Sequence, residues 1–126
     1  MTGIVLFAHG STVQSANDGV RGVAEELARR TGRTVEAAFL ECAPPTLADA
    51  VAKLSDSGVR RIVIVPYFLT MGIHLKRDLP RIAGELRNIY EGVSIEIGDP
   101  LDGHPGLIDI LVDRSKEALG DVRQTD

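Results

Sequence analysis

Four short apolar segments alternate along the chain with four longer segments of helical periodicity. The apolar runs are residues 4–8, 34–40, 61–68 and 93–97, and the third is the richest in Ile and Val. A short continuous apolar run is typical of a strand buried on both faces, as in a parallel sheet. The alternation therefore predicts an α/β fold with the order βαβαβαβα.

Helix signals fill the first two intervals between these runs. A helix is expected from about Ser15, with apolar residues three and four positions apart, and Gly32 is placed to end it. Thr46 can cap a second helix, with Asp49 three residues further on as an imperfect capping box. Gly58 is expected to stop that helix.

The third helix should follow a loop at residues 69–73. Asp78 is its expected N-cap, and Pro80 then falls in the first turn, where a missing N–H is tolerated. Pro105 should open a last helix, and the chain is expected to fray from Gly120. The apolar positions of these two helices are Leu79, Ile82, Ala83, Leu86 and Ile89, then Leu107, Ile110, Leu111, Ala118 and Leu119.

Strands and helices of these lengths predict a three-layer sandwich, with a four-stranded, mostly parallel sheet and helices on both faces. The 126 residues suit one domain spanning residues 1–126. If the strand order is 2-1-3-4, strand order reverses between strands one and three. Ligands of open α/β sheets bind beyond the carboxyl ends of the strands near such a point.

Composition excludes several classes of protein. Lys and Arg number 14 against 18 Asp and Glu, and this negative balance argues against a general nucleic-acid binder. The single cysteine, Cys42, predicts a reducing, cytoplasmic setting. We expect no signal peptide and no membrane span. The chain also lacks an ATP-binding GxxxxGK[ST] loop, a dinucleotide-binding GxGxxG turn and a CxxC zinc motif.

Side chains suited to metal binding and proton transfer follow the strands at one edge of the predicted sheet. His9, Glu41, His74 and Asp99 each lie at or just past the carboxyl end of a strand. Imidazole is a common ligand of divalent metals, and Glu41 could be a third ligand or a proton acceptor. A single histidine more often makes only hydrogen bonds in a turn. Because two histidines lie at equivalent strand ends here, a shared metal site and two separate turn contacts are equally favoured.

Other polar residues near this edge admit two readings each. Ser11 could be a nucleophile beside His9, although no GxSxG elbow is present, or it could bind a substrate carboxylate or its own turn. His104 sits in a DGHPG turn. The basic cluster, which we define as Lys76, Arg77 and Arg81, is either a solvated helix face or a receptor for an anionic ligand.

Five segments together resemble a known family. They are AHGS at 8–11, AFLE at 38–41, PxLxxA at 45–50, VPYFLTMGIHLKRDLP at 65–80 and HPGL at 104–107. The chain is similar to the short, single-domain class II tetrapyrrole chelatases, the sirohydrochlorin chelatases of cobalamin and sirohaem synthesis. It departs from many of them in having Thr12 after HGS, and it lacks the histidine-rich tract of some short forms.

The resemblance implies insertion of Co²⁺ or Fe²⁺ (Ni²⁺ in some relatives) into sirohydrochlorin without ATP. The metal is then a substrate, no cofactor is permanently bound, and the short form pairs as a homodimer. His9 and His74 match the two metal-binding histidines, and Glu41 matches an acidic residue. The loop with Phe68, Leu69, Met71 and Gly72 would be a wall for the macrocycle.

Two other functions stay open. The chain could be a metal-binding carrier of the same fold without catalysis. It could also be a hydrolase or transferase that uses His9 and Ser11.

Overall fold

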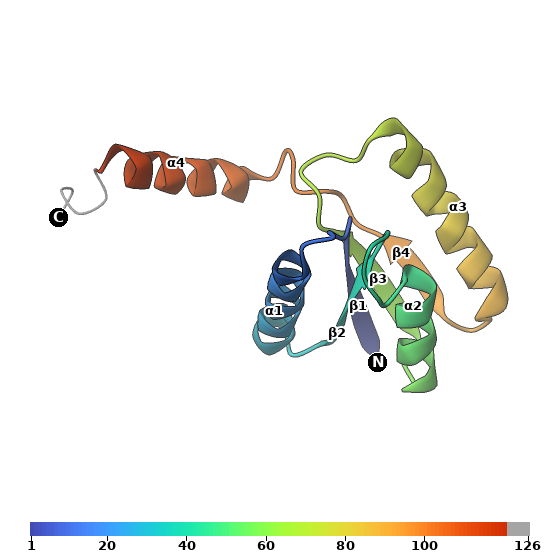
Figure 1. Ribbon diagram of the computed structural model, residues 1–126. Helices are drawn as coiled ribbons and strands as arrows, with labels where there is room; N and C mark the ends of the chain where they lie inside the picture. Colours follow the sequence, from blue (N-terminus) through green and yellow to red (C-terminus); the bar gives the residue numbers. More distant parts are fainter. Residues whose placement is uncertain (121–126) are drawn as a thin grey trace.

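The computed structural model describes residues 1–120 as a parallel sheet flanked by helices (Figure 1). Its elements are β1 (Thr2–Ala8), α1 (Gln14–Thr31), β2 (Thr34–Phe39), α2 (Leu47–Asp56), β3 (Arg61–Pro66), α3 (Ile73–Ile89), β4 (Ser94–Ile97) and α4 (Pro105–Leu119). All strand pairs are parallel, in the order β2-β1-β3-β4. The predicted fold class and strand order are therefore confirmed, and β1 and β3 lie side by side.

The main core lies between the sheet and the pair α2 and α3. Apolar side chains of β1, β3, α2 and α3 meet there and are almost fully buried: Val5, Phe7, Val51, Leu54, Ile62, Ile64 and Leu79. Helix α1 packs on the opposite face, mainly against β2 (Figure 1). These contacts give the three predicted layers and hold the carboxyl ends of β1 and β3 rigidly next to each other.

Several predicted helix ends are confirmed. The Thr46 side chain accepts a hydrogen bond from the Asp49 N–H at 3.1 Å, which caps α2. Gly32 ends α1 in the left-handed conformation that glycine adopts most readily. His104 caps α4 by accepting a hydrogen bond from Gly106 N–H at 2.9 Å, so its side chain is used in a turn.

The predicted start of α3 is wrong. Asp78 is not the N-cap, because the helix begins more than one turn earlier, after Gly72, and the Lys76 N–H bonds to the Gly72 carbonyl at 2.9 Å. Pro80 therefore lies inside the helix, where it lacks the N–H of an ordinary helical residue. The extra turn brings Leu75 against the core, and this burial offsets the bond lost at Pro80.

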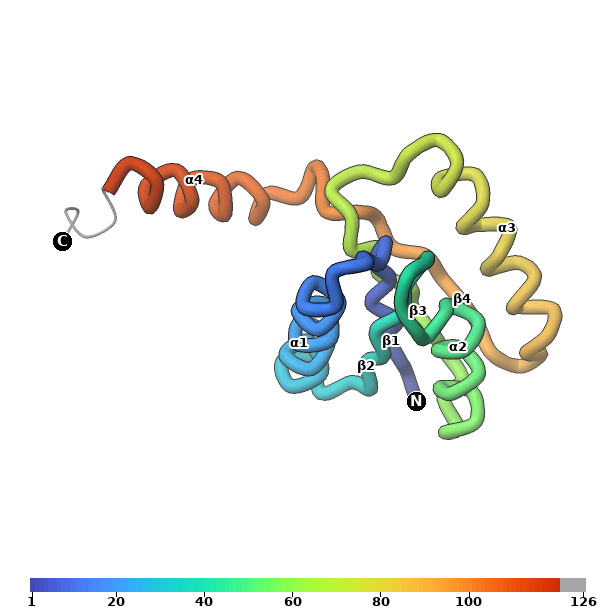
Figure 2. The backbone as a smooth tube through the Cα atoms, in the orientation of Figure 1, coloured from blue at the N-terminus to red at the C-terminus, as the bar shows by residue number. Residues whose placement is uncertain are grey.

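The last helix lies away from the three layers. No residue of α4 is buried, and Figure 2 shows it extending outward from the sheet and the other helices. Gly120 caps α4 in the left-handed conformation, and the rest of the predicted frayed end, residues 121–126, lies outside the described residues. Within residues 1–120, every helix is too short or too polar to traverse a lipid bilayer.

Candidate functional site

His9 and Glu41 lie side by side where β1 and β2 end. The Leu40 N–H donates to the Ala8 carbonyl at 2.9 Å, and the Glu41 N–H donates to the His9 carbonyl at 3.0 Å. These two bonds continue the β1–β2 pairing past the strands. They bring His9 Nε2 to 3.9 Å from Glu41 Oε2, with both side chains more than half exposed. Glu41 is thus placed to receive a proton from the imidazole or to share a cation with it.

Gly10 makes this close approach of the two strand ends possible. Its φ is +90°, a conformation that L side chains rarely adopt. A Cβ at this position would lie 1.8 Å from the Glu41 carbonyl oxygen, well inside van der Waals contact. The His9–Glu41 arrangement therefore requires glycine at position 10.

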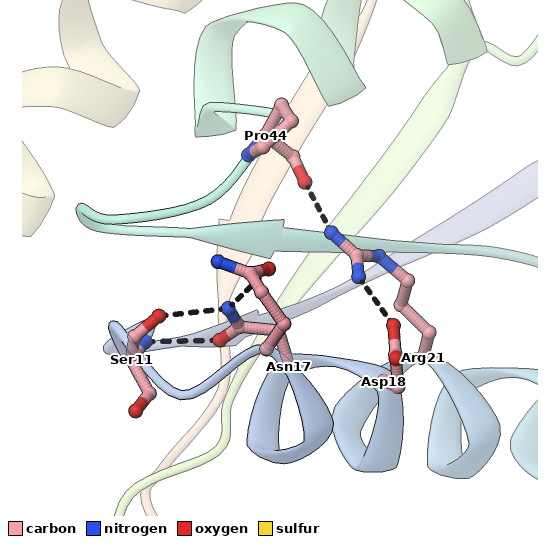
Figure 3. A network of polar contacts seen from close by, with 6 residues as sticks. Ser11, Asn17, Asp18, Arg21 and Pro44 are labelled. Atoms are coloured by element: carbon pink, nitrogen blue, oxygen red, sulfur yellow. Dashed lines mark hydrogen bonds and ion pairs between the residues drawn. The ribbon is translucent and has the colours of Figure 1, made fainter.

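Helix α1 holds the loops that carry both residues (Figure 3). The Asn17 side chain accepts from the Ser11 N–H at 2.9 Å and donates to the Ser11 carbonyl at 2.8 Å, and it is almost fully buried. One turn later, Arg21 donates to the Pro44 carbonyl at 2.9 Å and its guanidinium lies over the Phe39 ring. The β1–α1 loop and the β2–α2 loop are thus both fixed to one helix.

His74 occupies the first turn of α3, across from His9. Its Nδ1 lies 3.4 Å from an Arg77 guanidinium nitrogen, and Arg77 in turn pairs with Asp78 at 3.2 Å. The side chain of Arg81, one turn on, pairs with Glu85 at 2.9 Å. Basic groups therefore border His74 along the same helix.

His9 and His74 line one cavity of about 380 Å³ at the carboxyl edge of the sheet. Its walls are mostly apolar, with Phe68 and Gly72 among the residues predicted to line it. Arg81 of the basic cluster, predicted as a possible receptor for an anionic ligand, also lines the cavity, as does Ile73 at the end of the predicted loop. The sequence did not single out the remaining wall residues as site residues: Leu40, Leu75, Asp78 and Ile82. Four of the lining residues, at positions 74, 78, 81 and 82, share one helical face, a signal that required the correct start of α3.

Other predicted residues lie outside the walls of this cavity. Glu41 touches the site only through His9. Ser11 accepts a hydrogen bond from Val13 N–H at 3.0 Å through its hydroxyl, which is a turn contact. Leu69 is exposed, and Met71 packs against the core. Their roles toward a ligand stay predictions.

The histidine pair forms an open site. Among residues 1–120, no three His, Cys, Asp or Glu side chains are grouped closely enough to hold a metal ion. Asp99 and His104 line a separate hollow on the β4–α4 loop. A divalent metal held by two imidazoles would keep coordination positions free for other ligands, as an exchanging metal requires.

A cavity lined by two histidines beyond the carboxyl ends of a parallel sheet is the arrangement of α/β proteins that bind a ligand at this edge. Within that class the chain belongs to the CbiX family, whose profile matches residues 3–118.

Relatives match nearly the whole chain. A protein of Methanopyrus kandleri named sirohydrochlorin cobaltochelatase is 33% identical, with 96% of this chain and 99% of the relative covered. A protein of the same name from Saccharolobus islandicus is 38% identical, and the match covers 93% of this chain and 95% of the relative. A chloroplastic sirohydrochlorin ferrochelatase of Arabidopsis thaliana is 31% identical, covering 95% of this chain and 54% of the relative.

Solved structures share the fold. A CbiX protein from Marinobacter aquaeolei superposes with a TM-score of 0.85 at 30% identity, covering 95% of this chain and 98% of that one. SirB from Bacillus subtilis, solved with Fe³⁺, superposes with a TM-score of 0.84 at 24% identity. That match covers 93% of this chain and 47% of SirB, so one fold unit of this kind fills about half of SirB.

Proposed function

We propose that this chain inserts Co²⁺ or Fe²⁺ into sirohydrochlorin without ATP. The observation that carries the proposal is the pair His9 and His74 on one cavity in a chain that matches the CbiX family over residues 3–118. Relatives named sirohydrochlorin cobaltochelatase and ferrochelatase, 31–38% identical over 93–96% of the chain, support the reaction. The metal is a substrate here, and no permanently bound cofactor is needed.

The chemistry needs a loosely held metal and an acceptor for the two pyrrole protons of the macrocycle. His9 and His74 would hold the metal through neutral imidazoles and release it to the ring nitrogens. Glu41, 3.9 Å from His9 Nε2 and more than half exposed, would accept protons and pass them to water.

The cavity walls suit one side of a large, flat, acidic ring. Phe68, Ile73 and Ile82 offer apolar contact, and Leu69 and Met71 would continue that wall along the same loop. Arg81 would bind a substrate carboxylate, since its partner Glu85 is exposed and such surface pairs are weak. Lys76 and Arg77 would add attraction, and Ser11 would hydrogen-bond a carboxylate at the rim.

A second copy of the chain belongs to the same proposal. At about 380 Å³ the cavity is near the lower end of the ~300–1,000 Å³ range of small-molecule sites, so it can seat one side of a tetrapyrrole without enclosing it. The chain also matches only 54% of the Arabidopsis relative and 47% of SirB. We infer that the chain acts as a homodimer. We also infer a cytoplasmic location, in keeping with the exposed free thiol of Cys42.

Absorbance spectroscopy of sirohydrochlorin tests the reaction. Purified protein is mixed with sirohydrochlorin and either Co²⁺ or Fe²⁺, and the spectral change of metallation is followed against the uncatalysed rate. His9→Ala and His74→Ala should each remove most of the acceleration. Both residues are exposed, so circular dichroism should show the fold unchanged. If the protein does not accelerate metallation above the rate measured with metal and sirohydrochlorin alone, the proposed chelatase activity is refuted.

Two further outcomes separate the other functions. Binding of Co²⁺ by the wild type, lost in His9→Ala, without any metallation would identify a carrier. An activity that persists without metal and disappears in Ser11→Ala would identify a hydrolase or transferase.

A further inference from the structure

The two histidines of the cavity have opposite hydrogen-bonding partners, and His9 has the partner of a metal ligand. Its Nδ1 lies 3.1 Å from the Gly10 carbonyl oxygen, which can only accept a hydrogen bond, so Nδ1 carries the proton. The lone pair of the neutral imidazole is then on Nε2, the atom that faces Glu41 at 3.9 Å. Metal-binding histidines usually donate their second N–H to an oxygen in this way. His9 is therefore oriented to bind a metal through Nε2.

His74 has the reverse arrangement. Its Nδ1 faces the Arg77 guanidinium at 3.4 Å, and a guanidinium can only donate a hydrogen bond. The neutral imidazole therefore accepts from Arg77 through the Nδ1 lone pair and carries its proton on Nε2. In this state, neither ring nitrogen of His74 has a lone pair free for a metal.

A metal can bind His74 only when the contact with Arg77 breaks. Binding through Nδ1 would displace the guanidinium directly. Binding through Nε2 would move the imidazole proton to Nδ1, where two donors would face each other. Asp78 offers the guanidinium a second partner, because its carboxylate accepts from Arg77 Nε at 3.2 Å. Arg77 therefore competes with the metal for His74, whichever nitrogen the metal uses.

The charges beside the two histidines also differ in sign. The Glu41 carboxylate beside His9 attracts a divalent cation. The Arg77 guanidinium beside His74 is always protonated and repels one. Its side chain is 69% exposed, so solvent weakens this repulsion, but the repulsion acts in the same direction as the competition. Both effects make His74 the weaker ligand of the pair.

We propose that Arg77 keeps His74 a weak metal ligand, so that the metal binds first at His9 and Glu41 and is loosely held when the macrocycle arrives. The proposal rests on the two-histidine site of the proposed function and adds Arg77 as a positioning residue that acts through His74. Tight binding of the metal by both imidazoles would stabilise the state before transfer and slow the passage of the metal to the ring nitrogens. Arg77 prevents such tight binding by occupying the second imidazole.

Titration calorimetry with Co²⁺ alone tests the competition. Arg77→Met should bind Co²⁺ about 3–10-fold more tightly than the wild type, the size expected when one competing exposed hydrogen bond is removed. A damaged fold would weaken binding, so a gain in affinity cannot arise from misfolding. The matched control is Arg81→Met, which removes the same charge one turn further along α3, where Arg81 pairs with Glu85. Its Co²⁺ affinity should change by less than about twofold, because its charge is screened and its contact with Glu85 leaves His74 untouched.

A double-mutant cycle with His74→Ala separates the competition from the effect of charge alone. Arg77→Met also removes a positive charge and frees the Asp78 carboxylate, and both of these effects persist without His74. The gain in Co²⁺ affinity should therefore be clearly smaller in the His74→Ala background. His9→Ala should weaken Co²⁺ binding more than His74→Ala does.

Three results would overturn the proposal: an unchanged Co²⁺ affinity in Arg77→Met, an equal gain in the His74→Ala background, or a greater loss from His74→Ala than from His9→Ala. Transfer of preloaded Co²⁺ to sirohydrochlorin is measured separately by absorbance and should be slower in Arg77→Met than in the wild type. If the Co²⁺ affinities follow the expectation but no metallation occurs, the proposed function fails while the role of Arg77 at His74 stands.

Discussion

Gly10→Ala should destabilise the protein by about 3–4 kcal/mol. A left-handed φ costs an L residue roughly 1–2 kcal/mol. The added Cβ would lie 1.8 Å from the Glu41 carbonyl oxygen, so the two strand ends must separate. The bonds from Leu40 N–H to Ala8 and from Glu41 N–H to His9 would then be lost, at about 1 kcal/mol each. The same separation would move Glu41 away from His9.

Urea unfolding measures this loss against two controls. Gly32 has a φ of +67°, and an added methyl group there would have nothing within 4 Å, so Gly32→Ala isolates the backbone cost of roughly 1–2 kcal/mol. Gly19 lies in α1 in open space without a positive φ, and Gly19→Ala should stabilise by about 0.5–1 kcal/mol. With an m-value of about 2 kcal/mol/M, Gly10→Ala should unfold at about 1.5–2 M less urea. If Gly10→Ala loses no more stability than Gly32→Ala, the close approach of position 10 to the Glu41 carbonyl is refuted.

Three further changes test other parts of the structure. Asn17→Ala removes both hydrogen bonds to Ser11 and should cost about 1–3 kcal/mol in thermal melts, together with weaker Co²⁺ binding by titration. Leu79→Ala empties a fully buried core position and should cost about 2–5 kcal/mol in the same melts while leaving the histidines in place. The hydrogen bond from Arg61 lowers the pKa of Glu96, so this pair stabilises the fold at neutral pH and loses that contribution as the pH falls through the lowered pKa. Glu96→Gln should therefore be slightly less stable than wild type at pH 7, and the difference should vanish in acid unfolding curves.

The sheet was predictable because its strands are continuous apolar runs, although one face of β3 is only half-buried. Continuous apolar runs such as residues 61–68 are typical of strands in a parallel sheet. The helices between them are the crossovers that parallel pairing requires. The strand ends were less certain. β3 ends at Pro66, and a last bond to β1 runs from the Tyr67 N–H to the Phe7 carbonyl at 2.7 Å before the chain enters the loop.

The start of α3 was not predictable from local signals. Asp78 followed by Leu79 and Pro80 has the composition of a helix N-terminus, and a proline inside a helix is unfavourable. Packing of Leu75 on the core decided the outcome, and that contact becomes visible only when the sheet is assembled. The error hid the cavity face of α3, and with it the places of Asp78 and Arg81 in the wall.

The candidate site was predictable to the extent that it depends on topology. His9, Glu41 and His74 follow strands of one parallel sheet, so the sequence places them at one edge, and His9 and His74 do line one cavity. Contacts made by turns were not predictable. For Ser11 the sequence offered a turn contact only as one of several roles, and nothing in the sequence indicates that Asn17 binds the Ser11 backbone. The position of α4 away from the sheet was also not predictable, because the apolar positions of a helix do not show which surface it packs on.

The attachment of two loops to α1 restricts how the length of this chain can change. Asn17 holds the loop of His9, and Arg21, four residues later, holds the loop of Glu41. One residue inserted between them would rotate Arg21 by about 100° around the helix axis, away from Pro44. Insertions or deletions after Arg21 would move neither contact. The interval of four residues from Asn17 to Arg21 is therefore a spacing that this site needs, and Ala24, buried in the following turn, extends the restriction along the helix.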